Sequence, residues 1–138
     1  LFFDSKAKQE HCCHIRKVEP NRRALATVDA WITGLRRDQS KTRKAAPRVS
    51  VGVHDGRQVV KVAPLVDWTE EQVEDYIRQH QVPKSPLYDQ GYTSIGCMIC
   101  TTPTQPGEDK RAGRWRWFNE SHQDDHKECG IHRDGSGI

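Results

Sequence analysis

Hydrophobic and polar positions alternate in two neighbouring stretches, residues 48–53 and 58–62. A period of two is typical of a half-buried β-strand. The residues between the two stretches include Asp55 and Gly56, a pair favoured in the tight turns that join antiparallel strands. The sequence therefore predicts a β-hairpin here.

A helical pattern follows at residues 69–80. Its apolar face, with positions three and four apart, consists of Val73, Tyr76, Ile77 and His80. Thr69 is suited to the N-cap, and Gln72 three residues later completes a capping box. His80, in the last turn, is interpreted as a helix-end residue that is favourable to the helix dipole.

For the first third of the chain, the sequence predicts a helix, a strand and a loop. Residues 12–27 are expected to be helical, because good helix formers follow Pro20, which a first turn tolerates. Residues 30–33 are expected to form a short buried strand. The polar, basic residues 36–46 are expected to form a mobile loop.

Little regular structure is expected in residues 83–113, which are rich in Pro, Gly and Thr. A stretch of this length is unusual in a compact domain unless something else orders it, and a metal centre would do so. Cations and aromatic residues then alternate over residues 114–118, and the tail is polar.

Length and composition fit one domain or part of a larger one. The chain has 138 residues, of which 34% are hydrophobic and 30% charged. That is lean for a self-sufficient core, but it is not the composition of a disordered chain. No apolar run approaches the ~20 residues of a membrane helix, and residues 1–4 do not resemble a secretory signal. Because no apolar run is long enough to span a bilayer, we expect no membrane partner. Since the chain lacks a starting Met, we expect a fragment.

The net charge of +3 conceals an asymmetry. Residues 1–63 hold 14 Lys and Arg against 6 Asp and Glu, whereas residues 64–138 hold 8 against 13. A basic half could face an anionic ligand or nucleic acid. On the charges alone, a solvated basic surface is the simpler interpretation.

The five cysteines form a vicinal pair, a C-x-x-C motif and one further thiol. They are Cys12, Cys13, Cys97, Cys100 and Cys129. An odd count in this arrangement is a poor disulfide framework. It fits a reducing compartment in which thiols bind metal or do chemistry. We therefore expect the protein in the cytoplasm, or in a plastid if the source has one.

The two cysteine pairs could supply four thiolates to one centre. Adjacent cysteines rarely chelate one tetrahedral zinc, because successive side chains diverge, but they can reach two corners of an iron–sulfur cube. The spacing therefore favours an iron–sulfur cluster. A zinc site that includes His11 or His14, and cysteines without a metal, remain the alternatives.

Cys129 stands apart in the polar tail. Lys127 and His132 could favour its thiolate, which is the nucleophilic form. An exposed, activated thiol is a plausible covalent catalyst, whereas a lone cysteine is often a small buried hydrophobe. The residues alone leave both interpretations open.

Five short motifs stand in order along the chain. They read CCHIRKVEP at residues 12–20, AWITGLRRDQS at 30–40, GYTSIGCMICT at 91–101, RAGRW at 111–115 and KECGIH at 127–132. In this order they closely resemble the C-terminal half of assimilatory adenylyl-sulfate (APS) reductases, the relatives of phosphoadenylyl-sulfate (PAPS) reductases. The last motif is similar to the family's K-x-E-C-G-L-H, with Ile131 for Leu and one residue fewer after Lys127.

The resemblance implies an α/β fold, the C-terminal part of an adenine-nucleotide α-hydrolase-like (PP-loop) fold whose N-terminal phosphate-loop half is missing from this chain. It implies an iron–sulfur and substrate-binding region, residues 11–118, and a mobile catalytic tail, residues 119–138. The ligands of a [4Fe–4S] cluster would be Cys12, Cys13, Cys97 and Cys100. A cluster implies APS as the substrate, with PAPS as the alternative.

The resemblance also implies a two-step thiol transfer. Cys129 would attack the sulfur of APS, AMP would leave, and thioredoxin or glutaredoxin would release sulfite from the S-sulfocysteine. The implied substrate-binding residues are Lys17, Arg43, Arg111, Arg114 and His132. Guanidinium groups suit sulfate and phosphate oxygens. The loop that carries Arg43 is shorter than in the family.

Two other interpretations compete with the reductase. One is a zinc-stabilised module that contacts nucleic acid through residues 36–48 and the side chains of Trp115 and Trp117. The other is an iron–sulfur redox carrier. The resemblance favours the reductase, so the expected partners are APS, a thiol reductant and the missing N-terminal half rather than nucleic acid. A homo-oligomer is compatible with the sequence.

Overall fold

The computed structural model describes residues 5–117 and 119. These residues divide into two compact units, one that ends at Asp75 and one that begins at Tyr76. The division falls within the helix α3 (Glu70–His80). No helix of the described residues is long and apolar enough to span a membrane.

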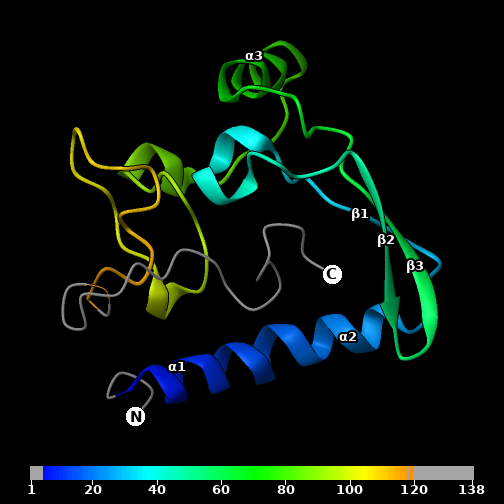
Figure 1. Ribbon diagram of the computed structural model, residues 1–138. Coiled ribbons are helices and arrows are strands. Elements are labelled where there is room, and N and C mark those ends of the chain that lie inside the picture. The colour runs from blue at the N-terminus through cyan, green and yellow to red at the C-terminus, as the bar shows by residue number, and fades with distance from the viewer. Residues whose placement is uncertain (1–4, 118, 120–138) are drawn as a thin grey trace. The chain divides into compact units, whose positions relative to one another are not determined.

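The first unit contains a three-stranded mixed sheet (Figure 1). β1 (Ala30–Ile32) pairs in parallel with β3 (Arg57–Val62), which pairs antiparallel with β2 (Val49–His54). The turn between β2 and β3 has φ of 47° at Asp55 and 79° at Gly56. A positive φ at both positions defines the hairpin turn that an Asp-Gly pair favours. The predicted hairpin and the predicted α/β class are therefore confirmed.

The strands of this sheet bury only some of their side chains. On β3, Val59 and Lys61 are 0% and 5% exposed. On β1, Trp31 is half-buried, but Ala30 and Ile32 are exposed. The expectation that this strand is buried is therefore wrong, because successive side chains point to opposite faces and only that of Trp31 packs. The apolar core cluster of the unit consists of Leu35, Ala46, Ala63 and Val66.

A run of three consecutive helical segments precedes the sheet, as predicted for residues 12–27. α1 (Lys6–Cys13) continues into a π-helical turn, η1 (His14–Val18), and then into α2 (Glu19–Leu25). Pro20 lies at the start of α2. Proline has no N–H and its ring clashes with the carbonyl four residues before it, so a wider turn ahead of Pro20 relieves that clash.

Residues 36–46 form two short turns instead of the predicted mobile loop. These are η2 (Arg37–Gln39) and η3 (Lys41–Arg43). The Arg37 backbone N–H donates to the Val66 carbonyl at 2.9 Å, and its Nε donates to the Ala46 carbonyl at 2.9 Å. These bonds anchor the segment to the core, which is why the polar pattern was misleading.

The predicted capping box at the start of α3 is confirmed. The Thr69 backbone N–H donates to Gln72 Oε1 at 2.8 Å, and the Gln72 backbone N–H donates to Thr69 Oγ1 at 3.2 Å. Near the other end of the helix, the rings of Tyr76 and His80 contact each other, with centroids 4.2 Å apart.

The second unit is mostly irregular, as predicted for residues 83–113. Among its described residues, beyond the end of α3, lie the 3-10 turns η4 (Pro86–Gln90) and η5 (Met98–Cys100). An antiparallel bridge pairs Thr101 with Arg114. This bridge places the C-x-x-C motif beside the Arg-Trp stretch.

Candidate functional site

The vicinal cysteines are the last two residues of α1, immediately before the π-helical turn. Both are half-buried. One turn earlier, Gln9 is 1% exposed, and its Nε2 donates to Cys13 Sγ at 3.8 Å. An amide N–H directed at a sulfur stabilises negative charge on that sulfur, as a metal-bound thiolate requires. Lys17, which the sequence predicts to bind substrate, is half-buried in η1.

The C-x-x-C motif forms a tight turn in the second unit. The Cys100 backbone N–H donates to the Cys97 carbonyl at 2.9 Å. Thr101 Oγ1 donates to the same carbonyl at 2.9 Å and accepts from the Gly96 backbone N–H at 3.1 Å. The Cys100 carbonyl accepts from the backbone N–H of Trp115 at 3.1 Å. Hydrogen bonds from Thr101 and from Trp115 thus fix the backbone of the turn that carries both thiols.

The guanidinium of Arg114 lies against Ile95 and Gly96, the two residues that precede this turn. The residue is 6% exposed, and its Nη1 donates to the Ile95 carbonyl at 3.5 Å. A Cβ atom built at Gly96 would lie 2.3 Å from Arg114 Nη2. The Arg114 Cζ lies 4.4 Å from the ring centroid of Trp115, which is fully buried. Only glycine at position 96 therefore admits the guanidinium in this position.

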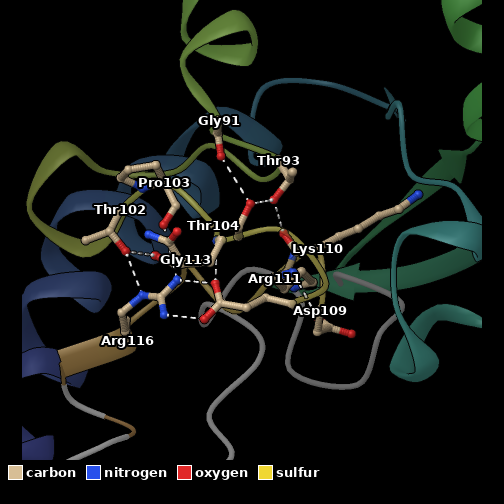
Figure 2. A network of polar contacts seen from close by, with 12 residues as sticks. Gly91, Thr93, Thr102, Pro103, Thr104, Asp109, Lys110, Arg111, Gly113 and Arg116 are labelled. Carbon is tan, nitrogen blue, oxygen red and sulfur yellow. Dashed lines mark hydrogen bonds and ion pairs between the residues drawn. The ribbon is translucent and has the colours of Figure 1, made fainter.

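Arg111 lies on a loop that a polar network anchors (Figure 2). The Arg111 backbone N–H donates to Asp109 Oδ1 at 2.8 Å, and its carbonyl accepts from the Arg114 backbone N–H at 2.9 Å. Thr93 Oγ1 donates to the Lys110 carbonyl at 2.7 Å. Arg111 and Arg114 are thus joined within one turn.

Arg116 is a cation that sequence reasoning did not single out. It donates to both carboxylate oxygens of Glu108, at 2.7 and 2.6 Å, and its Nη2 donates to the Pro103 carbonyl at 3.1 Å. The hydrogen bonds from Arg116 and from the Gln105 backbone N–H lower the pKa of Glu108 to about 2. Because the two partners are eight residues apart in an irregular segment, no periodicity marks them as a pair.

Arg43 is buried in the first unit, at 8% exposure. Its Nη1 donates to Gln39 Oε1 at 2.6 Å, and the same oxygen accepts from the Arg36 backbone N–H at 3.1 Å. Lys61 is also buried, with its Nζ 5.2 Å from the ring centroid of Trp31. Burial, and then the charge of Arg43, lower the pKa of Lys61. Sequence reasoning missed Lys61, because a lysine in a β-strand ordinarily indicates a solvent-facing position.

The structure thus presents the proposed ligands as two separate pairs. Cys12 and Cys13 belong to the first unit, whereas Cys97 and Cys100 belong to the second. Among the residues described, no group of three or more His, Cys, Asp or Glu side chains could hold a metal ion. The donor set suits an iron–sulfur cluster, since each pair offers two thiols close in the chain, and Gln9 Nε2 donates to Cys13 Sγ. Cys129 and His132, with the predicted catalytic tail, lie outside the described residues.

The described residues thus combine a mixed α/β sheet with two cysteine pairs and the buried arginines Arg43 and Arg114. Residues 2–103 match the model of the phosphoadenosine phosphosulfate reductase domain. The chain belongs to this family, and the resemblance seen in the sequence is confirmed.

Curated relatives carry a more specific name. The chain is 48% identical over 132 residues to the adenosine 5′-phosphosulfate reductase of Allochromatium vinosum, covering 96% of this chain and 49% of that protein. The enzyme of that name from Burkholderia cepacia is 51% identical over 131 residues, covering 95% and 50%. The chain therefore spans about half the length of these relatives.

Solved structures agree on the fold. The phosphoadenylyl-sulfate reductase of Candida auris, in a phosphate complex, is 35% identical with a TM-score of 0.59, covering 72% of this chain and 47% of that one. An FMN adenylyltransferase of Candida glabrata has a TM-score of 0.50 at 15% identity, covering 82% and 43%. The second likeness concerns the fold alone, and both support the predicted α/β architecture.

Proposed function

We propose that the protein reduces adenosine 5′-phosphosulfate to sulfite and AMP in assimilatory sulfate reduction. The observation that carries this proposal is the Cys97–Cys100 turn with the Arg114 guanidinium buried against Gly96. It occurs in a chain about half identical to proteins named as reductases of this compound. A buried cation has a clear use where both the substrate and the leaving group are anions.

The proposed chemistry is a two-electron thiol transfer. The Cys129 thiolate forms a bond to the sulfur of APS, while the bond between that sulfur and the phosphate oxygen breaks and AMP leaves with the electron pair. A thiol of thioredoxin or glutaredoxin then attacks the Cys129 sulfur, and sulfite leaves. The second thiol of the reductant closes its own disulfide and returns Cys129 to the thiol.

Two cations of this region have a definite task in the proposed reaction. Negative charge grows on the AMP phosphate as the bond breaks, and guanidinium forks placed there lower the barrier. We assign this task to Arg111 and Arg114 on their shared turn, with Lys17, Arg43 and His132 as further substrate-binding residues. Burial strengthens the effect, because a cation in a low-dielectric site acts more strongly than one in water.

We further propose that the two cysteine pairs hold one [4Fe–4S] cluster. Its ligands would be Cys12, Cys13, Cys97 and Cys100. The N–H from Gln9 to Cys13 supports this assignment, since it favours charged sulfur. Each of the four thiolates would hold one iron of the cluster. The thiol chemistry takes its electrons from the reductant. Such thiols call for a reducing compartment, such as the cytoplasm.

The test is a sulfite assay on the complete, anaerobically purified protein, supplied with thioredoxin and either APS or PAPS. We expect sulfite and AMP from APS, and broad visible absorbance near ~400 nm with bound iron. If the protein turns over PAPS but not APS, PAPS is the substrate instead. Zinc in place of iron, with no sulfite from either nucleotide, would refute the proposal.

A further inference from the structure

Trp115 has a backbone conformation that residues with a side chain rarely adopt. Its φ is 52°, in the left-handed region, although the residue is a fully buried tryptophan. Glycine adopts a positive φ without cost, whereas a bulky residue there is an outlier. Such a strained residue persists only where the surrounding structure holds it in place, and strained residues cluster at functional sites.

Hydrogen bonds hold the backbone of Trp115 on both of its sides. Its N–H donates to the Cys100 carbonyl at 3.1 Å, and its carbonyl accepts from the Asn119 backbone N–H at 2.9 Å. Asn119 Nδ2 also donates to the carbonyl of Arg114 at 3.5 Å. These bonds fix the strained conformation, in which the chain passes from the β-bridge at Arg114 to the helical residues after Trp115.

The strained backbone brings two neighbouring side chains together. In an extended strand, successive side chains point to opposite faces, so an arginine does not stack on the residue that follows it. Here the Arg114 Cζ lies over the Trp115 ring, 4.4 Å from its centroid, which is the geometry of a cation–π pair. The same guanidinium reaches Gly96, where a Cβ atom would lie 2.3 Å from Arg114 Nη2. The guanidinium is thus packed against both the tryptophan ring and Gly96.

We propose that Trp115 is a positioning residue, which holds the Arg114 guanidinium in the orientation that binds an anionic oxygen of the nucleotide. The negative face of the ring attracts the cation. Flat contact between the ring and the planar guanidinium fixes the plane in which the N–H donors point. A guanidinium that is ordered before the anion binds loses less conformational entropy on binding. That the anion is the phosphate of AMP or APS rests on the proposed function.

A tryptophan with only a packing role leads to different expectations. Its loss would lower stability, and it would weaken anion binding to the same extent whether or not Arg114 is present. If the ring acts through Arg114, its loss should matter only while the guanidinium is there. Phenylalanine should then rescue binding, because its ring also attracts a cation.

The test measures AMP binding by calorimetry in the complete, anaerobically purified protein. Trp115→Leu and Trp115→Phe are each made in the parent protein and in Arg114→Ala. In the parent, we expect Trp115→Leu to raise the dissociation constant for AMP about tenfold, and Trp115→Phe to raise it less than about threefold. In Arg114→Ala, neither substitution should change it further. Trp117→Leu removes another tryptophan of the same stretch and should leave the affinity close to that of the parent.

Three results would overturn the inference. One is a loss of affinity in Trp115→Leu that persists in Arg114→Ala, and another is an equal loss in Trp117→Leu. The third is a Trp115→Leu protein with the affinity of the parent. If Trp115→Leu does not fold, Arg114→Lys provides the second measurement, because lysine keeps the charge but not the planar group that the ring orients. Affinity equal to that of the parent in Arg114→Lys would also overturn the inference.

AMP binding needs neither turnover nor a reductant, so these outcomes are distinct from those of the reductase assay. A protein that reduces APS but shows no coupling between Trp115 and Arg114 loses only the role of Trp115. A protein that binds no AMP overturns this inference together with the proposed function.

Discussion

Arg114 and Gly96 lie so close that a Cβ atom at position 96 would come within 2.3 Å of Arg114 Nη2. The contact involves the far end of a flexible side chain, so Gly96→Ala should displace the guanidinium without unfolding the protein. We expect kcat/KM for APS to fall by about 100- to 1,000-fold, the scale of losing one charge-stabilising donor. Steady-state kinetics of sulfite release measure this loss.

The double variant provides the control for that prediction. If Gly96→Ala acts only through Arg114, then Gly96→Ala with Arg114→Ala should be no slower than Arg114→Ala alone. Additive losses would show that glycine at position 96 has another role, such as shaping the turn of Cys97.

Thr101 closes the turn that carries Cys97 and Cys100 through a single hydroxyl. Thr101→Val keeps the volume but leaves the Gly96 backbone N–H without this acceptor. The unfolding free energy should fall by about 1–3 kcal/mol, and visible absorbance should bleach faster in a chelator. Thr101→Ser retains the hydroxyl and should behave like the parent protein. Equal bleaching rates in all three proteins would contradict the proposed role.

Glu108 contributes stability that depends on pH. Its folded pKa, about 2, lies below the ordinary value of 4.5, since Arg116 donates to it. The contribution is therefore complete above pH 4.5 and is lost as the pH falls through that value toward 2. The difference in Tm between the parent and Glu108→Gln should shrink from pH 6 to pH 3. Asp89→Asn, which removes a more exposed carboxylate, should show a much smaller change over this range.

The cysteines should separate into two classes when each is replaced by serine. Substitution of Cys12, Cys13, Cys97 or Cys100 should lower bound iron and sulfide together, because each iron of a cube needs its own thiolate. Cys129→Ser should keep the full iron content but release no sulfite. Metal analysis and absorbance spectra distinguish the two classes. Full iron in a Cys100→Ser protein would remove that residue from the ligands.

Local sequence signals predicted several elements of this fold. The hairpin follows from Asp55-Gly56, where both residues adopt positive φ. The start of α3 follows from Thr69 and Gln72, which exchange hydrogen bonds as a capping box. In each case the determining contacts lie within a few residues, so a short window of sequence contains the whole physical cause.

Contacts between distant residues could not be predicted in this way. The turns of residues 36–46 depend on bonds from Arg37 to Val66 and Ala46, and a polar composition alone indicated a loop. Lys61 is buried because β3 is the central strand and its ammonium lies over the ring of Trp31 on the neighbouring strand. The alternation of residues within β3 does not reveal this neighbour. Arg114 was predicted to be a substrate-binding cation. That its guanidinium lies buried against Gly96 could be seen only in the three-dimensional structure.

The central claim is that Cys129 attacks the sulfur of APS, and one measurement tests it most directly. The complete protein is incubated with APS in the absence of any reductant, and its peptides are analysed by mass spectrometry while released AMP is quantified. We predict one SO₃ group on Cys129, with an equal amount of AMP, and no such adduct in Cys129→Ser. An adduct on another cysteine, or none at all despite bound APS, would contradict the account.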